Sequence, residues 1–196
     1  PLAPGAPLCD AAAMARGATI YRVHLELSHI DRGVYADRSL SLAQHPSETL
    51  ERALVRLLAY GLRYAEDLEF GRGVSATDEP DLWTREGDGR TIEWIEVGQP
   101  EMKKLVKAAR HAQRAVLFAF GEGCWRWRKA ELEPLVDPPA NLGVVHIEDA
   151  FVKALAATAE RHLRWSMTVS EGILFLSTEG ESFETTPEVW LGDPLA

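Results

Sequence analysis

The chain has 196 residues, of which 46% are hydrophobic and 26% charged, a composition typical of a soluble globular domain with its own core. Its formal net charge of −9 argues against a protein that coats nucleic acid without specificity, because phosphate binding needs a cationic surface. No run of eighteen apolar residues is present, so we expect no membrane partner. Cys9 and Cys124 are too few for a disulfide framework or a zinc cluster, and this favours a cytoplasmic protein.

Residues 1–13 lack both the basic and the apolar region of a secretory signal, and regular patterning begins only after Met14. We therefore expect 1–13 to be a tail outside the fold and 14–196 to form a single domain. Apolar and polar residues alternate over 18–29 and 34–44, which predicts two strands with a tight connection.

The pattern then changes to a helical period, which predicts a helix over 46–65, followed by a short strand at 68–70. The next elements are predicted to be strands at 80–85 and 91–98, a helix at 101–113, a strand at 115–120, a short helix at 125–136, a strand at 141–148, a helix at 149–163 and a hairpin over 164–178. The last residues carry no clear pattern. This order predicts an α/β domain with one mixed β-sheet flanked by helices.

The two strands at 80–85 and 91–98 are joined by Asp88-Gly89, a strong signal for a two-residue hairpin turn. In that register, residues that lie opposite each other have numbers summing to 88 + 89 = 177, so Asp81 lies opposite Glu96. Their Cβ atoms would be roughly 4.5–5.5 Å apart. The same register makes two further pairs of large side chains, Trp83 with Trp94 and Leu82 with Ile95.

Two like charges held directly opposite each other destabilise a hairpin unless something compensates them. A divalent cation bound through oxygen ligands is an economical compensation, which makes Asp81 and Glu96 candidate metal ligands. The alternative is a solvated edge at which both side chains point into water, and the spacing alone leaves both interpretations open.

Further acids stand at the start of the first predicted helix. Glu48 and Glu51 are about one turn apart, so both can face the same point as Asp81 and Glu96. The alternative for each is compensation of the helix dipole at the N-terminus.

Four motifs give the chain a resemblance to a known family. "HPSETLER", "AEDLEF", "DEPDLW" and "WIEVGQP" occur in the order and spacing of the YaeQ-like family of bacterial proteins, and the similarity extends from about Ala18 to Trp190. That family looks like a divergent branch of the PD-(D/E)XK nuclease superfamily, whose restriction-endonuclease-like core has the order α-β-β-β-α-β. The elements predicted over 46–120 have this order, with extra strands before and after them.

The resemblance implies specific roles for the acids. Asp81 corresponds to the aspartate of "PD" and Glu96 to the (D/E) position, which in the superfamily bind Mg²⁺ (or Mn²⁺). An acid on the first helix often assists, which fits Glu48 or Glu51. The activity that follows is metal-assisted hydrolysis of phosphodiester bonds in DNA or RNA.

The chain departs from the superfamily at one position. The catalytic lysine would fall at Gly98, which offers no amine. Gln99 directly after it, or Lys103 on the next helix, is then the candidate to orient the attacking water or to stabilise the charge on the phosphate.

A set of basic residues follows the candidate site and is the predicted nucleic-acid-binding surface: Lys103, Lys104, Lys107, Arg110 and Arg114. The spacing of residues 103, 107, 110 and 114 puts them on one face if the helix continues that far. The stretch 124–129 adds basic residues interleaved with Trp125 and Trp127, a combination that suits phosphate contact with base stacking. The alternative is that the lysines are the solvated side of an amphipathic helix and the tryptophans belong to the core.

The leading hypothesis is therefore a Mg²⁺-dependent PD-(D/E)XK-like nuclease. The first alternative is a catalytically impaired nucleic-acid-binding or transcription-related regulatory protein on the same fold. A second is a metal-binding scaffold for protein partners. The missing lysine and the acidic net charge favour the first alternative.

Overall fold

The computed structural model describes residues 17–71 and 79–195, so the predicted tail over 1–13 lies outside the described residues. The strands are β1 (Thr19–His29), β2 (Val34–Gln44), β3 (Glu69–Phe70), β4 (Leu82–Arg85), β5 (Thr91–Val97), β6 (Ala112–Ala119), β7 (Leu142–His146), β8 (His162–Ser170), β9 (Ile173–Ser177), β10 (Ser182–Thr185) and β11 (Glu188–Leu191). The helices are α1 (Leu50–Leu62), α2 (Met102–Ala109), α3 (Cys124–Trp127) and α4 (Asp149–Ala157), with a 3₁₀ turn η1 (Ile30–Arg32) and a π-helical turn η3 (Arg128–Leu132).

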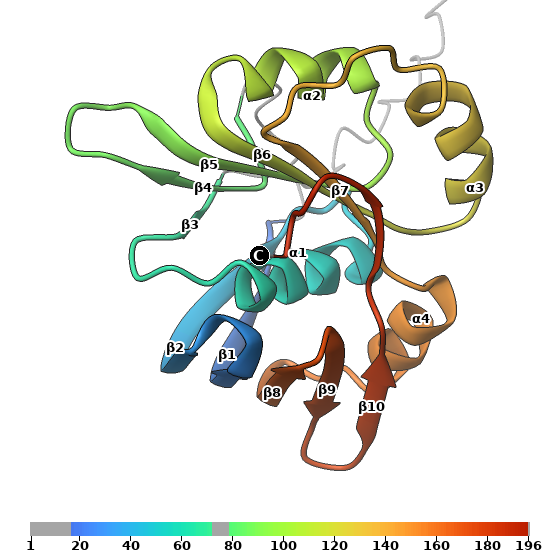
Figure 1. The fold of residues 1–196 in the computed structure, drawn as a ribbon. Coiled ribbons are helices and arrows are strands. Elements are labelled where there is room, and N and C mark those ends of the chain that lie inside the picture. The colour runs from blue at the N-terminus through green and yellow to red at the C-terminus, as the bar shows by residue number, and fades with distance from the viewer. Residues whose placement is uncertain (1–16, 72–78, 196) are drawn as a thin grey trace, which may run out of the picture.

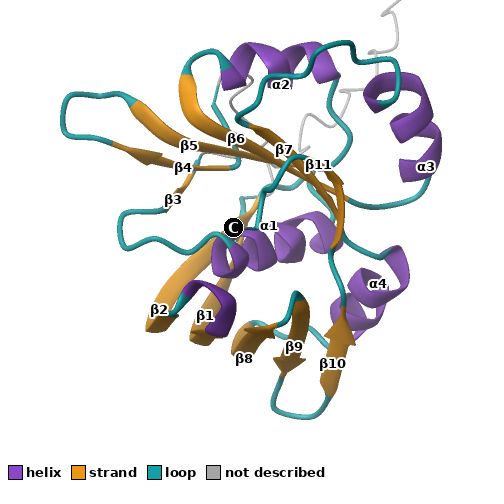
Figure 2. Ribbon diagram, in the orientation of Figure 1, coloured by secondary structure: helices purple, strands orange, loops and turns teal. Residues whose placement is uncertain are grey.

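The strands form two mixed sheets, so the prediction of one sheet is wrong. The first has the order β10-β9-β8-β1-β2 and the second the order β11-β7-β6-β5-β4-β3 (Figures 1 and 2). The reason lies in α1, in which every residue from 53 to 62 is buried. A helix that is buried all round needs cover on opposite sides, and the two sheets provide it.

The elements therefore stack in layers, with α2 above the six-stranded sheet, α1 below it, and the five-stranded sheet beneath α1 (Figure 1). The main core spans α1 and both sheets, and includes Leu25 on β1 and Phe118 on β6. A second core fills the space between α2, α3 and the other face of the six-stranded sheet, around Leu105 and Leu117.

The strands β5, β6 and β7 run parallel, with α2 and α3 in the connections between them. Their carboxyl ends therefore meet at one edge of the six-stranded sheet. Ligands of open α/β sheets bind outside this edge, because loops and helix N-termini converge there.

The register of the β4–β5 hairpin is the predicted one, although its turn is not. Leu82 pairs with Ile95 and Trp83 with Trp94. The turn has three residues instead of two, since Glu86 N donates to Arg90 O at 2.9 Å. A bulge between Thr84 and Arg85 compensates for the extra loop residue, so the two deviations cancel.

Two boundaries differ from the prediction in ways that affect the site. The helix predicted over 101–113 ends at Ala109, and β6 begins at Ala112, before its predicted start.

The C-terminal residues, for which the sequence predicted no clear pattern, form two strands: β10 pairs with β9, and β11 pairs with β7. Short edge strands like these carry little periodicity of their own.

Candidate functional site

Two of the predicted acids, Glu48 and Glu96, line a hollow of about 470 Å³ at the carboxyl ends of β5 and β6. The N-terminal turn of α1 closes one side of this hollow and α2 the other. Its lining includes Glu48, Arg52, Glu96, Gly98, Gln99 and Lys104.

Asp81 is buried at the point where the β4–β5 ladder ends, with 2% of its surface exposed. Its own N–H donates to Ile95 O at 2.9 Å, and its Oδ2 accepts the N–H of Val97 at 2.8 Å. Both carboxylate oxygens accept from Nη2 of Arg52 on α1, each at 2.8 Å. The Asp81 side chain is thus held between the end of β5 and the first turn of α1.

Glu48 precedes α1 and does not lie within its first turn, because Thr49 is the N-cap and accepts the N–H of Arg52. The Glu48 carboxylate is fully buried and accepts from Arg52 Nη1 at 2.7 Å and from Arg56 Nη1 at 2.8 Å. Glu51, the other candidate, is half-buried, and no hydrogen bond or ion pair joins it to the acids of the hollow. Of the two candidate helix acids, the structure brings only Glu48 to Asp81.

Glu96 lies on β5 with 5% of its surface exposed. Its Oε1 accepts from Lys104 Nζ at 2.8 Å and from Trp94 Nε1 at 2.9 Å. Burial raises the pKa of Glu96 above its usual value, Lys104 opposes that change, and the negative charge of Asp81 adds to it. Asp81 is therefore close enough to Glu96 for its charge to act on it, as the hairpin register predicts.

Sequence reasoning missed the cations that compensate these acids. Arg52 and Arg56 contact Glu48 and Asp81, and Lys104 contacts Glu96. Burial lowers the pKa of Arg52, but Asp81 and Glu48 outweigh burial and raise it overall. The sequence contained a signal for these pairs, because residues 48, 52 and 56 are spaced by four, the spacing at which side chains meet along a helix.

Carboxylate oxygens are the donor type that Mg²⁺ and Mn²⁺ prefer, so the chemistry of Asp81, Glu96 and Glu48 fits such a metal. Their present placement offers no ready cage, since the described residues contain no group of three or more His, Cys, Asp or Glu side chains that could hold an ion. The guanidinium of Arg52 lies between Glu48 and Asp81 instead. Its side chain is 21% exposed and lines the open hollow.

Gly98 and Gln99 occupy the place where the superfamily lysine was expected. Gly98 has a φ of 111°, a conformation that side-chain-bearing residues rarely adopt. Gln99 Nε2 donates to Phe120 O at 2.9 Å and to Glu122 O at 3.1 Å. Its amide group therefore contacts the backbone of the loop after β6, and no contact with the acids is present among the described residues.

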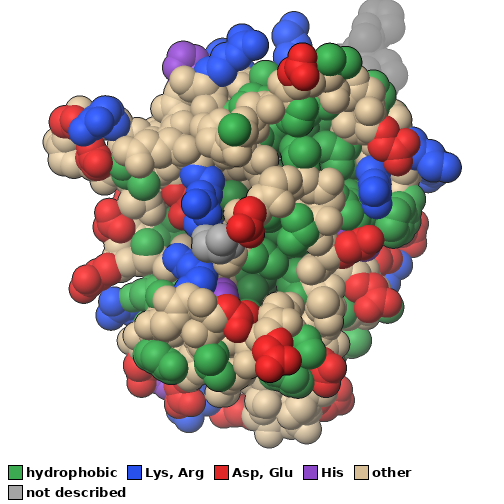
Figure 3. All heavy atoms as spheres, viewed as in Figure 1, with side chains coloured by type: hydrophobic (Ala, Val, Ile, Leu, Met, Phe, Trp, Pro, Cys, Tyr) green, Lys and Arg blue, Asp and Glu red, His purple; other side chains and the backbone are tan. Residues whose placement is uncertain are grey.

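The basic residues divide into three groups. Lys103, Lys107 and Arg110 are exposed on or just after α2, and in Figure 3 basic side chains gather over this helix. Lys104 turns inward to Glu96, which makes it the helix lysine that reaches the acids, in place of the predicted Lys103. Arg114 does not share their face, because α2 ends at Ala109.

Arg114 lies instead on β6, opposite Glu93 of β5. Glu93 accepts from Arg63 Nε of the α1 C-cap at 2.7 Å, which puts this pair on the α1 side of the sheet. The sequence pattern could not reveal the position of Arg114, because that position depends on where α2 ends.

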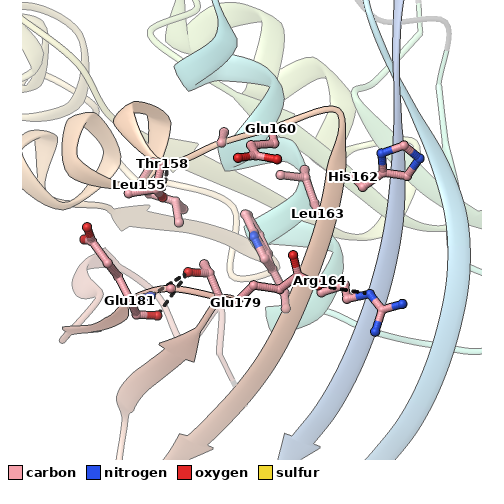
Figure 4. Close-up of a pocket in the computed structure, with 12 residues that line it drawn as sticks. Leu155, Thr158, Glu160, His162, Leu163, Arg164, Glu179 and Glu181 are labelled. Atoms are coloured by element: carbon pink, nitrogen blue, oxygen red, sulfur yellow. Dashed lines mark hydrogen bonds and ion pairs between the residues drawn. The ribbon is translucent and has the colours of Figure 1, made fainter.

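A second hollow, of about 170 Å³, lies between the end of α4 and the β9–β10 hairpin (Figure 4). Acidic side chains border it, namely Glu160, Glu179 and Glu181, and Arg164 is paired with Glu179 at 3.3 Å. This charge distribution disfavours a phosphate-containing ligand. Among the described residues no helix is both long and apolar enough to cross a membrane.

The family model described as "YaeQ protein" matches residues 14–187. Proteins named "Uncharacterized protein YaeQ" from Escherichia coli K12 and Shigella flexneri are each 34% identical to the chain, covering 90% of it and 98% of the relative. Among solved structures, the YaeQ protein from Xanthomonas axonopodis pv. citri has a TM-score of 0.85 and 39% identity, covering 89% of this chain and 99% of that one. The YaeQ protein from Pseudomonas syringae has a TM-score of 0.86 and 36% identity, covering 90% and 98%. The chain belongs to the YaeQ family.

Proposed function

We propose that this protein hydrolyses phosphodiester bonds of nucleic acid with Mg²⁺ or Mn²⁺ at the hollow between α1 and α2. The observation that carries the proposal is that the buried Glu48 and Glu96 line one open hollow, and that buried Asp81 is joined to Glu48 through Arg52, which lines the same hollow. Buried carboxylates close together raise the free energy of the folded state unless cations pair with them, and such clusters are typical of functional sites. The order α1-β3-β4-β5-α2-β6 supports the proposal, since it is the order of the PD-(D/E)XK core.

Asp81, Glu96 and Glu48 would hold the metal in this function. When bound, the metal would lower the pKa of a water molecule and offset the charge that develops on the phosphate. Arg52 would release the carboxylates and turn its guanidinium toward the open hollow, where it can bind two oxygens of a phosphate group bidentately.

Lys104 takes the role of the missing lysine in this proposal. Its ammonium group is already 2.8 Å from Glu96, so it can orient the attacking water or donate to the phosphate without a large movement. Gln99 would position the loop after β6 through its bonds to Phe120 O and Glu122 O, rather than contacting the water. Lys103, exposed one residue earlier, would contact phosphates farther along the strand.

The test is cleavage of end-labelled single- and double-stranded DNA and RNA with Mg²⁺, with Mn²⁺ and with EDTA. We expect metal-dependent cleavage that falls about 100-fold or more in Asp81→Asn and in Lys104→Ala, because each removes a group that acts on the transition state. Lys103→Ala is the matched control on the same helix turn and should fall only a few-fold. Metal-dependent cleavage at the wild-type rate in Asp81→Asn would contradict the proposal.

A second candidate function is nucleic-acid binding without catalysis. The pairing of Glu48, Asp81 and Glu96 with Arg52, Arg56 and Lys104 favours it, because the carboxylates are already compensated without a metal. This candidate predicts no heat of Mn²⁺ binding in calorimetry and no cleavage. It also predicts oligonucleotide binding that weakens steeply with salt, through the exposed Lys103, Lys107 and Arg110.

A further inference from the structure

Beside the hollow lies a cluster of aromatic and basic side chains that the proposed chemistry does not use. It consists of Trp125 on α3, Arg128 on η3, His146 at the end of β7 and Trp190 on β11. His146 stacks on Trp190 with ring centroids 4.4 Å apart and an angle of 9°. The Arg128 guanidinium lies 5.2 Å from the Trp125 ring and 4.7 Å from the Trp190 ring, so it contacts both indoles.

This cluster is on the same face and at the same edge of the six-stranded sheet as Glu96. Glu96 pairs in register with Leu117 on β6, and His146 pairs with Ala119 of the same strand. Leu117 and Ala119 are two residues apart, so their side chains and those of their partners point to one face. Two strand spacings separate β5 from β7, which puts the backbones of Glu96 and His146 on the order of 10 Å apart across the sheet.

The loop over 120–123 connects the cluster to the hollow. Gln99, which lines the hollow, donates to Phe120 O and Glu122 O in this loop. A Cβ atom on Gly123 would lie 3.3 Å from Arg126 Nη2 and 3.9 Å from Gln99 Oε1, so the Arg126 guanidinium packs over the loop next to Gln99. Gln99 and Arg126 are therefore close to each other at this loop, and exposed Trp125 is the chain neighbour of Arg126.

The two tryptophans of the "CWRWRK" segment have different environments. Trp127 is buried and its Nε1 donates to Pro100 O at 2.8 Å, so it belongs to the core. Trp125 is 53% exposed, although exposing an indole of this size is unfavourable in water. Among the described residues, Trp190 Nε1 is a buried N–H group without a hydrogen-bond partner, and Arg128 Nε makes no hydrogen bond and only a long ion pair with Glu133, at 3.7 Å.

We propose that Trp125, together with Arg128, stacks an unpaired nucleobase of the substrate whose phosphates lie at the hollow. The inference rests on the proposed function and narrows its substrate to single strands or to strands with an unpaired nucleotide next to the cleavage site. An exposed indole with an adjacent guanidinium offers a base both a π-face and a positive charge. A base inside a duplex has both faces covered by its neighbours and gains nothing from Trp125.

The test is oligonucleotide binding in EDTA, measured by fluorescence anisotropy, so that neither metal nor hydrolysis contributes. The probes are a labelled single-stranded 12-mer, the same backbone with abasic sites, and the corresponding duplex. We expect Trp125→Ala to bind the single strand about tenfold more weakly than wild type, and Trp125→Phe to retain most of the affinity. Tyr35→Ala, which removes an aromatic residue that is 68% exposed on β2 of the other sheet, is the matched control and should bind as wild type does.

On the abasic strand, wild type and Trp125→Ala should bind equally, because the phosphates remain and the bases are gone. Equal affinity of wild type and Trp125→Ala for the base-containing single strand overturns the inference, even if cleavage is metal-dependent. Absence of any oligonucleotide binding by wild type overturns it as well. A loss in Trp125→Ala that depends on bases, together with absence of cleavage, supports the inference while refuting the phosphodiesterase activity.

Discussion

At the scale of the residue, Gly98 has a backbone conformation that disfavours a lysine at this position. The chain leaves β5 here with a φ of 111°, and a Cβ atom at this position would find nothing within 4 Å. Space is therefore available for a side chain, but the backbone conformation is unfavourable for any residue other than glycine. A lysine would strain the end of the strand that carries Glu96, and the proposed function assigns the amine to Lys104 of α2 instead.

We expect Gly98→Ala to lower the free energy of unfolding by about 1–2 kcal/mol, because the strain is confined to the backbone. Gly87→Ala is the control, since Gly87 also has open space around it but no positive φ. That variant should stay within about 0.5 kcal/mol of wild type. Urea denaturation with a constant m-value measures both, and equal stabilities of the two variants would refute the strain at Gly98.

His29 is a second residue whose environment has a measurable consequence. It is 1% exposed, and both of its ring nitrogens lack a hydrogen-bond partner among the described residues. Burial lowers the pKa of His29 below its usual value, and the nearby Arg32 lowers it further. The folded state therefore binds a proton at His29 less readily than the unfolded chain does.

Because the folded-state pKa is the lower one, His29 contributes stability above the unfolded pKa of about 6.5, and this contribution is lost as the pH falls. We expect His29→Leu to be at least as stable as wild type at pH 7.5. At pH 5 its advantage should be larger than at pH 7.5, since the folded wild type then excludes a proton that the unfolded chain binds. Thermal or urea unfolding at both pH values checks this, and a stability difference that is independent of pH would contradict it.

At the scale of the element, α1 determines how the two sheets come together. Gly61 in its last turn lets the side chain of Met167 on β8 approach the helix backbone closely, where a Cβ atom would collide with the methionine sulfur. Glycine lowers helix propensity, so its position inside α1 is explained by packing and not by local preference.

We expect Gly61→Ala to lower the free energy of unfolding by about 1–3 kcal/mol through overpacking, despite the better helix propensity of alanine. In Gly61→Ala combined with Met167→Ala, the added methyl group should enter the space that the methionine leaves. The double-mutant cycle should therefore give a favourable coupling of about 1 kcal/mol or more. Additive effects of the two substitutions would refute the contact.

Periodicity was a good guide to those elements that present one face to the core. The alternation over 34–44 predicted β2 with its observed bounds, because every second side chain faces inward. The end of α2 was not predicted, because no glycine or proline marks it and "AARHAQR" continues the helical pattern. Pairing of β6 with β5 and β7 decides where that helix stops.

At the scale of the whole molecule, one core holds the two sheets together. Leu25 of the five-stranded sheet, Leu58 of α1 and Phe118 of the six-stranded sheet are all fully buried in it. A shared core of this kind makes the two sheets one cooperative unit.

We therefore expect a single unfolding transition, with the same midpoint when it is followed by far-UV circular dichroism and by tryptophan fluorescence. Trp165 of the five-stranded sheet and Trp127 of α3 are both buried, so the fluorescence reports on opposite ends of the molecule. Leu58→Ala in α1 should lower both midpoints together. Separate midpoints would mean that each sheet unfolds with a core of its own.

The sequence by itself predicted the register that puts Asp81 opposite Glu96, because alternation acts over short stretches of chain, but the three-residue turn and the bulge that produce this register were seen only in the structure. The sequence also shows that Glu48, Arg52 and Arg56 are spaced by four. Only the tertiary structure revealed which acids the two arginines contact. The choice of Lys104 over Lys103, the placement of Arg114 beyond α2, and the exposure of Trp125 beside buried Trp127 were decided by packing between distant segments. Neighbouring residues with the same local preference acquire different environments only when the rest of the chain packs around them.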